Sequence, residues 1–204
     1  MMVGAGYWPR SEDDAELAGR LIAILRATAP LMQVLRTARH LGLPDWLVFS
    51  GAVYQPVLNH LTGRPADYGI KDYDLAYFDP SDLSYEAEDA VIRRVAGAFA
   101  EPLRSMVEVR NQARVHLWFE AKFGEPYPAL ACTAAALQRF ASPIFAIGVR
   151  LERDDRLHVE APFGLTDLFA LRLRPNPRRK SQHFALTCAN VLRRWPELAV
   201  QDAP

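Results

Sequence analysis

Two aspartates, Asp72 and Asp74, are separated by one residue within an apolar and aromatic segment from Ile70 to Phe78. This composition predicts a β-strand. Because side chains alternate across a strand, the two carboxylates face the same side, with their Cα atoms roughly 6.5–7 Å apart. Carboxylates so close repel each other unless a positive charge lies between them, and hard divalent cations prefer oxygen ligands. The pair therefore predicts a binding site for Mg²⁺ or Mn²⁺.

A strand-to-helix turn precedes the aspartates by some twenty residues. The apolar run from Trp46 to Phe49 ends in Ser50 and Gly51, and a segment with helical periodicity follows as far as Gly63. Glycine at such a turn lets backbone N–H groups approach an anion, and the N-terminus of a helix favours negative charge. An ordinary turn has the same pattern, so the phosphate-binding interpretation depends on the neighbouring aspartates.

A second polar face follows from the segment between Ser105 and Trp118, which alternates apolar and polar residues. Such alternation predicts a long strand with one buried face. Glu108, Arg110 and Arg114 share its polar face. Two interpretations stay open: these side chains join the aspartates at one site, or they form a ladder of charges on a solvated face.

The region from Trp46 to Asp79 resembles the nucleotidyltransferase superfamily, whose signature is a strand, a Gly-Ser or Gly-Gly turn, a helix and a strand carrying Asp-x-Asp. The segments SGAVYQPVLNHLTGRP and IKDYDLAYFD are similar to the head of tRNA-nucleotidyltransferases and poly(A) polymerases. A bacterial family of nucleotidyltransferase-like proteins resembles the chain more closely and over more of its length, from about residue 17 to 198. The further shared segments are VEVRNQARVHLW, APFGLTDLFALRLRPNP and RRWPEL.

The resemblance implies an enzyme that transfers a nucleoside monophosphate from an NTP to a hydroxyl group and releases pyrophosphate. Asp72 and Asp74 would be catalytic metal ligands for Mg²⁺ or Mn²⁺. Because a third carboxylate on a neighbouring strand is usual in this superfamily, Glu108 is expected to complete the set. The residues expected to bind the nucleotide are Ser50, Gly51, Arg110 and Arg114.

One departure from the family pattern bears on activity. Relatives carry Arg-Asp or Arg-Asn after Gly-x-Val, whereas this chain has Tyr54 and Gln55. A residue that would help to hold the nucleotide is therefore absent, so either nucleotide affinity or choice differs, or activity is lost. Two alternatives follow: a catalytically silent nucleotide-binding module, and an interaction partner of the toxin–antitoxin type on the same fold.

Length and pattern predict an α/β (α+β) fold. We expect a nucleotidyltransferase-like small mixed β-sheet flanked by helices, with a C-terminal helical segment. The 204 residues suit a single domain. Residues 11–118 would form the N-terminal helices and catalytic core, and residues 119–204 a hairpin and C-terminal helices.

Charge and composition restrict the partners. Lys plus Arg equals Asp plus Glu at 24 each, so no global field gathers polyanions. We therefore expect a small-molecule or protein acceptor rather than RNA; the oligomeric state and the choice of NTP stay open.

The remaining composition predicts a cytoplasmic protein. Cys132 and Cys188 lie far apart, in no metal-ligand spacing, and are expected to be reduced thiols. No apolar run approaches the roughly 18–20 residues of a membrane span, and the first residues lack the pattern of a secretion signal. No membrane association is expected.

Overall fold

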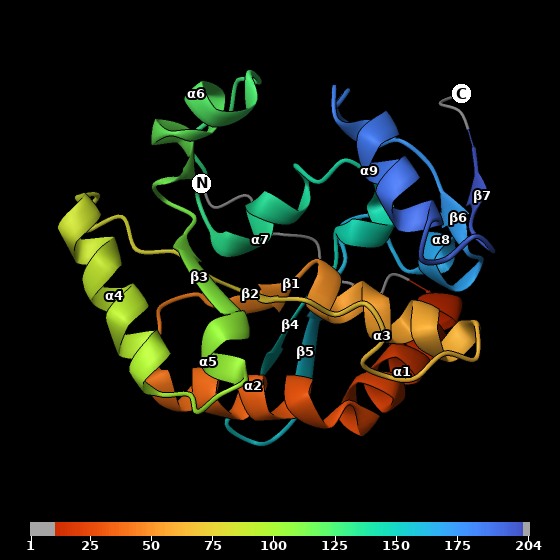
Figure 1. Cartoon of the computed structure of the whole chain (residues 1–204), viewed down its shortest axis with the longest axis horizontal. Coiled ribbons are helices and arrows are strands. Elements are labelled where there is room, and N and C mark those ends of the chain that lie inside the picture. Colours follow the sequence, from red (N-terminus) through yellow and green to blue (C-terminus); the bar gives the residue numbers. More distant parts are fainter. Residues whose placement is uncertain (1–10, 202–204) are drawn as a thin grey trace.

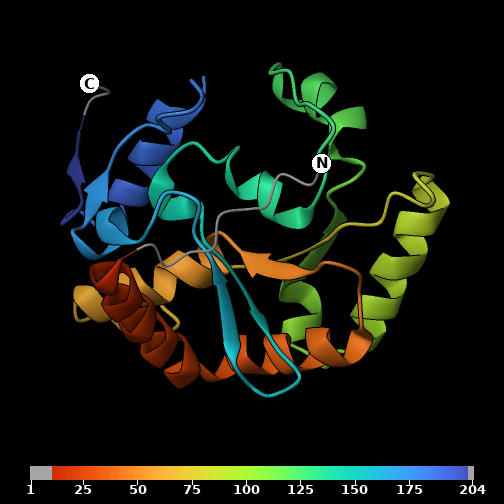
Figure 2. The ribbon, with the colours of Figure 1, turned by 180° about the vertical axis from the view of Figure 1, so that it is seen from behind.

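The computed structural model describes residues 11–201. The first residues, which were expected to carry no secretion signal, lie outside this described part of the chain. A five-stranded mixed sheet crosses the molecule and has helices on both sides (Figures 1 and 2). This arrangement confirms the predicted fold class. The strands of this sheet are β1 (Leu47–Phe49), β2 (Tyr73–Tyr77), β3 (Val107–Asn111), β4 (Gly148–Leu151) and β5 (Leu157–Glu160).

The strand order is β3-β2-β1-β4-β5. Strand β1 pairs antiparallel with both β2 and β4, and β4 pairs antiparallel with β5 as the predicted hairpin. Strands β2 and β3 are parallel, because the chain between them crosses over through a helix. This topology places the end of β1, where Ser50 begins the turn, next to Asp74 on β2.

Four helices, α1 to α4, cover one side of the sheet, at the bottom and outer edges of Figure 1. Ser11 caps α1, because its hydroxyl accepts a hydrogen bond from the Asp14 N–H at 3.1 Å. Leu21 and Leu25 of α1 and Leu35 of α2 are fully buried in the main core. The helices on this side are α1 (Glu12–Ala27), α2 (Ala29–Leu41), α3 (Gly51–Leu61) and α4 (Tyr85–Gly97), with the short α5 (Leu103–Met106) at the end of the crossover.

The opposite side carries the C-terminal half of the chain. Helices α6, α7 and α9 rise above this side in Figure 1. A second, smaller apolar cluster joins Leu47 and Phe49 of β1 to Ala136 and Leu137 of α7. The remaining elements of this half are η1 (Val115–Leu117), α6 (Phe119–Phe123), α7 (Thr133–Leu137), η2 (Pro143–Phe145), α8 (Thr166–Phe169), α9 (Phe184–Leu192) and the two-stranded parallel sheet of β6 (Arg172–Leu173) and β7 (Ala199–Val200). Of these, α8 packs against α1 and α3.

The predicted long strand from Ser105 to Trp118 is wrong in its extent, because β3 ends at Asn111. The buried Asn111 side chain accepts a hydrogen bond from the Asp79 N–H and donates one to the Asp79 carbonyl. Its carbonyl oxygen also accepts from the Ala113 N–H, which turns the chain. Because the Asn111 side chain binds the backbone in this way, the hydrogen-bond ladder of β3 ends here, and a 3₁₀ turn follows.

Within residues 11–201, no single helix is long and apolar enough to cross a membrane. Helices α1 and α2 reach that length only together, as a pair bent by 94°.

Candidate active site

Asp74 lies on β2, between β1 and β3 and beside the end of β1. Its backbone is the register partner of Phe49 on β1 and of Glu108 on β3. Register partners on neighbouring strands point to the same face of a sheet, so Glu108 and Asp74 share one face. The structure therefore brings these two predicted site residues together.

The carboxylate of Asp74 is in an unfavourable environment for its charge. Burial, together with the negative charges of Asp72 and Glu108, raises the pKa of Asp74 to about 7, against a smaller lowering by Arg110. Asp72, Asp74 and Glu108 are thus electrostatic neighbours, with the most buried carboxylate between the other two. Like charges held together without a compensating cation indicate a site for a positive ligand.

The predicted phosphate turn lies beside the same carboxylates. Helix α3 begins at Gly51, as predicted, and the Oδ1 atom of Asp72 lies 3.9 Å from the position that a Cβ on Gly51 would take. Ser50 has φ 60° and ψ −130°, a backbone conformation that L-residues rarely adopt and that is typical of functional turns. The first N–H groups of α3 have no intrahelical acceptor, so this turn can bind an anion next to Asp72.

Gln55, one of the two residues that depart from the family pattern, covers this turn. Its Nε2 atom lies 2.8 Å from the position of a Cβ on Gly51. The same amide donates a long hydrogen bond of 3.4 Å to the Tyr54 hydroxyl. Gln55 is only 6% exposed, and its buried Oε1 atom has no partner within the described residues. The neutral amide of Gln55 thus lies against the turn.

The two predicted arginines have different environments. Arg110 is on β3, two residues after Glu108, and lines the same cavity as Asp74. Arg114 does not reach the site, since β3 ends before it. Its guanidinium forms a buried ion pair with Glu88 and donates to the Leu83 carbonyl at 2.8 Å. The expectation that Arg114 shares the polar face of the strand is therefore wrong.

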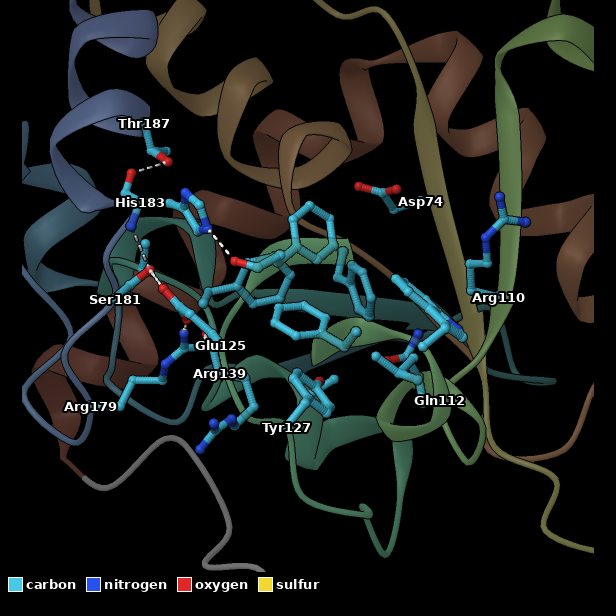
Figure 3. Close-up of a pocket in the computed structure, with 18 of the residues that line it drawn as sticks. Asp74, Arg110, Gln112, Glu125, Tyr127, Arg139, Arg179, Ser181, His183 and Thr187 are labelled. Atoms are coloured by element: carbon cyan, nitrogen blue, oxygen red, sulfur yellow. Dashed lines mark hydrogen bonds and ion pairs between the residues drawn. The ribbon is translucent and has the colours of Figure 1, made fainter. Parts of the chain in front are cut away.

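A cavity of about 710 Å³ opens from Asp74 toward the C-terminal half of the chain. Figure 3 shows Asp74 and Arg110 at one end, a group of aromatic rings in the middle, and Glu125, Arg179 and His183 at the other end. Phe49 belongs to the wall next to Asp74, and α9 forms the far wall. The predicted C-terminal helical segment therefore contributes to the site.

The sequence patterns pointed to none of the residues from Trp118 to Tyr127 as site residues, so the aromatic wall of this cavity was missed. Four aromatic side chains occur within ten residues, which is dense for a loop, and this density was the available signal. They are Trp118, Phe119, Phe123 and Tyr127.

The donor set suits a hard divalent cation. Asp72 and Asp74 supply oxygen atoms only, and their mutual repulsion raises the pKa of Asp74. Within residues 11–201, no three His, Cys, Asp or Glu side chains are arranged as a ready ligand set. Asp72 and Asp74 thus offer two carboxylates to such an ion, and Glu108 is exposed on the adjacent strand.

Solved structures define the class of this fold. One is a protein whose NMR structure reveals a CCA-adding enzyme head domain; it is 22% identical, with a TM-score of 0.70 over 88% of this chain and 95% of that chain. Another is a CCA-adding enzyme in complex with CTP, 13% identical with a TM-score of 0.50. The match covers 89% of this chain but only 43% of that enzyme. These likenesses show a mixed α/β fold like that of the CCA-adding enzyme head domain.

The family follows from the sequence profile. Residues 36–200 match the profile of the Nucleotidyltransferase family, so the chain belongs to that family. A search of curated proteins found no match.

Proposed function

We propose that this protein transfers a nucleoside monophosphate from an NTP to the hydroxyl group of an acceptor. In this reaction the acceptor oxygen forms a bond to the α-phosphorus. The bond from the α-phosphorus to the oxygen that bridges it to the β-phosphate breaks, and pyrophosphate leaves with the electron pair. The hydroxyl proton passes to a carboxylate. Membership of the Nucleotidyltransferase family supports the reaction class.

The observation that carries the proposal is the position of Asp74. Its carboxylate is buried between Asp72 and Glu108 at the sheet end where α3 begins, and its pKa is raised to about 7. A protein that used these acids only for stability would pair them with cations. Nucleotidyl transfer instead requires a negative site that can hold cation and phosphate together.

Each residue has a role that its position permits. The turn at Ser50 and Gly51 would bind the leaving pyrophosphate portion through the N-terminus of α3. Glu108 lies across from Asp74 and would accept the proton of the hydroxyl. Arg110 lines the cavity beside Asp74 and would stabilise negative charge on the transferred phosphate.

Asp72 and Asp74 would hold Mg²⁺ or Mn²⁺, with Glu108 as a further ligand; when bound, such an ion neutralises charge on the phosphate oxygens. The raised pKa of Asp74 makes its affinity for a cation depend on pH, because the acid must lose its proton to act as a ligand.

Nucleotide binding and turnover test this proposal. Isothermal titration with each of the four NTPs, with Mg²⁺ and with EDTA, should give metal-dependent binding by the wild type. CTP belongs in the panel because the CCA-adding enzyme of similar fold was solved with CTP. A ligand at 100 times its Kd should also stabilise the protein by about 2.7 kcal/mol in a melting experiment.

The variant Gly51→Val tests the phosphate turn. Its side chain would enter the space that Gln55 and Asp72 border, and would keep phosphate from the backbone. We expect NTP affinity to fall about tenfold or more with little change in melting temperature, since the Gln55 amide can move. Gly19→Ala on α1 is the matched control, because a Cβ there meets nothing within 4 Å.

The outcomes separate the proposal from its alternatives. NTP binding by the wild type that Gly51→Val leaves unchanged would refute the phosphate turn. Binding without pyrophosphate release would favour a silent nucleotide-binding module, which the departure at Tyr54 and Gln55 also favours. The absence of any NTP binding would favour a role in protein interaction.

A further inference from the structure

The phosphate turn lies outside the cavity, next to Asp74. Asp74 and Arg110 line the cavity, whereas Ser50, Gly51 and Asp72 are not among its lining residues. Asp72 instead lies against Gly51 at the start of α3. Asp74 is therefore the residue that the two compartments share.

The geometry of phosphoryl chemistry assigns a reactant to each compartment. In such a reaction the attacking and leaving oxygens lie roughly in line on opposite sides of the phosphorus. If the leaving pyrophosphate is held at the turn of Ser50 and Gly51, the attacking hydroxyl must approach from the opposite side of the phosphorus. The cavity is lined by Asp74 but not by the turn, so it offers the acceptor a separate compartment.

Aromatic rings form most of the cavity wall near its centre. The ring centroids of Phe119 and Tyr127 are 4.5 Å apart, and those of Phe119 and Phe123 are 4.7 Å apart. Trp118 adjoins both phenylalanines at 6.1 and 6.3 Å. Burial raises the pKa of Tyr127 to about 12, so its phenol stays neutral. This wall suits the face of a flat, apolar molecule.

The charged side chains at the far end of the cavity contact other residues of the protein. Glu125, which is 4% exposed, forms an ion pair with Arg179. The Arg139 guanidinium lies over the Tyr127 ring at 5.3 Å from its centroid. A polyanion such as RNA requires cations that face outward, whereas the guanidinium of Arg179 is neutralised by Glu125.

The rim of the cavity is apolar where it meets solvent. Phe123 is 37% exposed and Leu186 is 62% exposed, and both line the cavity. The two walls are tied together, because His183 is hydrogen-bonded to the Phe123 carbonyl at 3.2 Å and the Gln182 N–H donates to Glu125 at 2.7 Å. These contacts hold the two walls of the compartment together, and its volume of about 710 Å³ is that of a small-molecule site.

We propose that the acceptor is a small, uncharged molecule with a flat apolar body and a hydroxyl group, bound against the wall of Trp118, Phe119, Phe123 and Tyr127 with the hydroxyl toward Asp74. This inference rests on the proposed nucleotidyl transfer and names the substrate class for it. It excludes an RNA end and a protein side chain as the acceptor.

Binding of 2-naphthol, which combines a flat apolar body with one hydroxyl group, tests the compartment. Isothermal titration should detect binding to the wild type, and Trp118→Ala should raise the Kd by about tenfold. Leu186→Glu places a charge on the exposed rim of α9, where it does not disturb packing, and should also weaken binding. Tyr85→Ala is the control, because Tyr85 is 65% exposed on α4 and does not line the cavity.

The affinity of the same variants for Mg²⁺-NTP separates this inference from the proposed function. Weaker 2-naphthol binding with unchanged NTP affinity in Trp118→Ala and Leu186→Glu supports the acceptor site. Equal 2-naphthol affinity in wild type and both variants would overturn it, and so would a loss of NTP affinity in the variants, since the cavity would then hold the base. A wild type that binds 2-naphthol but no NTP refutes the transfer reaction and the acceptor role with it.

Discussion

Two groups of charged side chains lie at opposite ends of β3, and their electrostatic environments are opposite. At the start of the strand, Glu108 adjoins Asp74, and the pKa of Asp74 rises to about 7. Just beyond its end, Arg114 forms an ion pair with Glu88, and the side chains are 10% and 8% exposed. The first group gathers like charges at a cavity, and the second neutralises opposite charges inside the core.

The difference teaches how to distinguish function from stability among acidic residues. Glu88 also accepts a hydrogen bond from the Asn111 N–H at 2.8 Å, so both of its oxygens are bound by the protein. Asp74 has two carboxylate neighbours, Asp72 and Glu108, which add to the effect of its burial. An acid whose charge the fold leaves destabilised is available to a ligand, whereas a fully paired acid is not.

The largest expected effect is the loss of the buried ion pair. Arg114→Ala leaves Glu88 charged and buried without its partner, so we expect the free energy of unfolding to fall by about 3–5 kcal/mol. Urea denaturation followed by circular dichroism measures this. The control is Arg93→Ala, which breaks the ion pair with Asp89 on α4, because Arg93 is 79% exposed and such a pair contributes about 0.5 kcal/mol or less. Equal losses in the two variants would show that the Glu88 pair has no structural role.

Asp74→Asn should instead increase the free energy of unfolding of the metal-free protein. The pKa of Asp74 is raised from 3.8 to about 7 in the fold, so between these values the folded protein retains a proton that the unfolded chain releases. Stability therefore falls as pH rises through this window, and the penalty is complete above pH 7. A shift of three units corresponds to at most about 4 kcal/mol, and partial exposure reduces it.

We therefore expect metal-free Asp74→Asn to be about 1–2 kcal/mol more stable than wild type at pH 8, with the gain shrinking toward pH 4. Thermal and urea unfolding in EDTA at several pH values measure this difference. Metal-dependent stabilisation by NTP should disappear in the same variant. Asp13→Asn on the exposed side of α1 should change the unfolding free energy by less than about 0.5 kcal/mol. A variant that melts below wild type at pH 8 would mark Asp74 as a structural residue.

Local patterns were sufficient to predict the elements around Asp74. The period-two pattern around Asp72 and Asp74 and the glycine turn at Gly51 depend on near neighbours. The structure has the helix start at Gly51, and its strand is shorter than predicted, since it begins at Tyr73, one residue after Asp72. Arg114 is buried because it forms an ion pair with Glu88, which lies 26 residues away in the chain. The two side chains meet only because α4 packs beside β3. Alternation along the sequence could not reveal this pairing.

The cavity was beyond sequence reasoning for a similar reason. Its walls come from η1, α6, α7 and α9, and they meet only through contacts such as that of Glu125 with Arg179, 54 residues later in the chain. Gln55 shows how much the sequence can reveal about a single residue. The sequence reveals that it departs from the family pattern, but only the structure shows its amide against Gly51.

The smallest expected effect is on the pKa of Asp74, and it tests whether the charge of Glu108 influences this pKa. Glu108 raises the pKa of Asp74, although its own side chain is exposed. In Glu108→Gln this negative neighbour is neutralised without a change of shape, so the pKa of Asp74 should fall below about 7, by less than about one unit. A carbon-13 NMR titration of the Asp74 carboxyl in metal-free buffer measures the shift. Glu86→Gln, an exposed change on α4, should leave the titration where it is in the wild type.

If both variants gave the wild-type titration, burial and Asp72 alone would account for the raised pKa of Asp74. Glu108 would then lose its place in the carboxylate group and its proposed role as the proton acceptor, because a carboxylate that Asp74 does not sense is too remote to take the hydroxyl proton there.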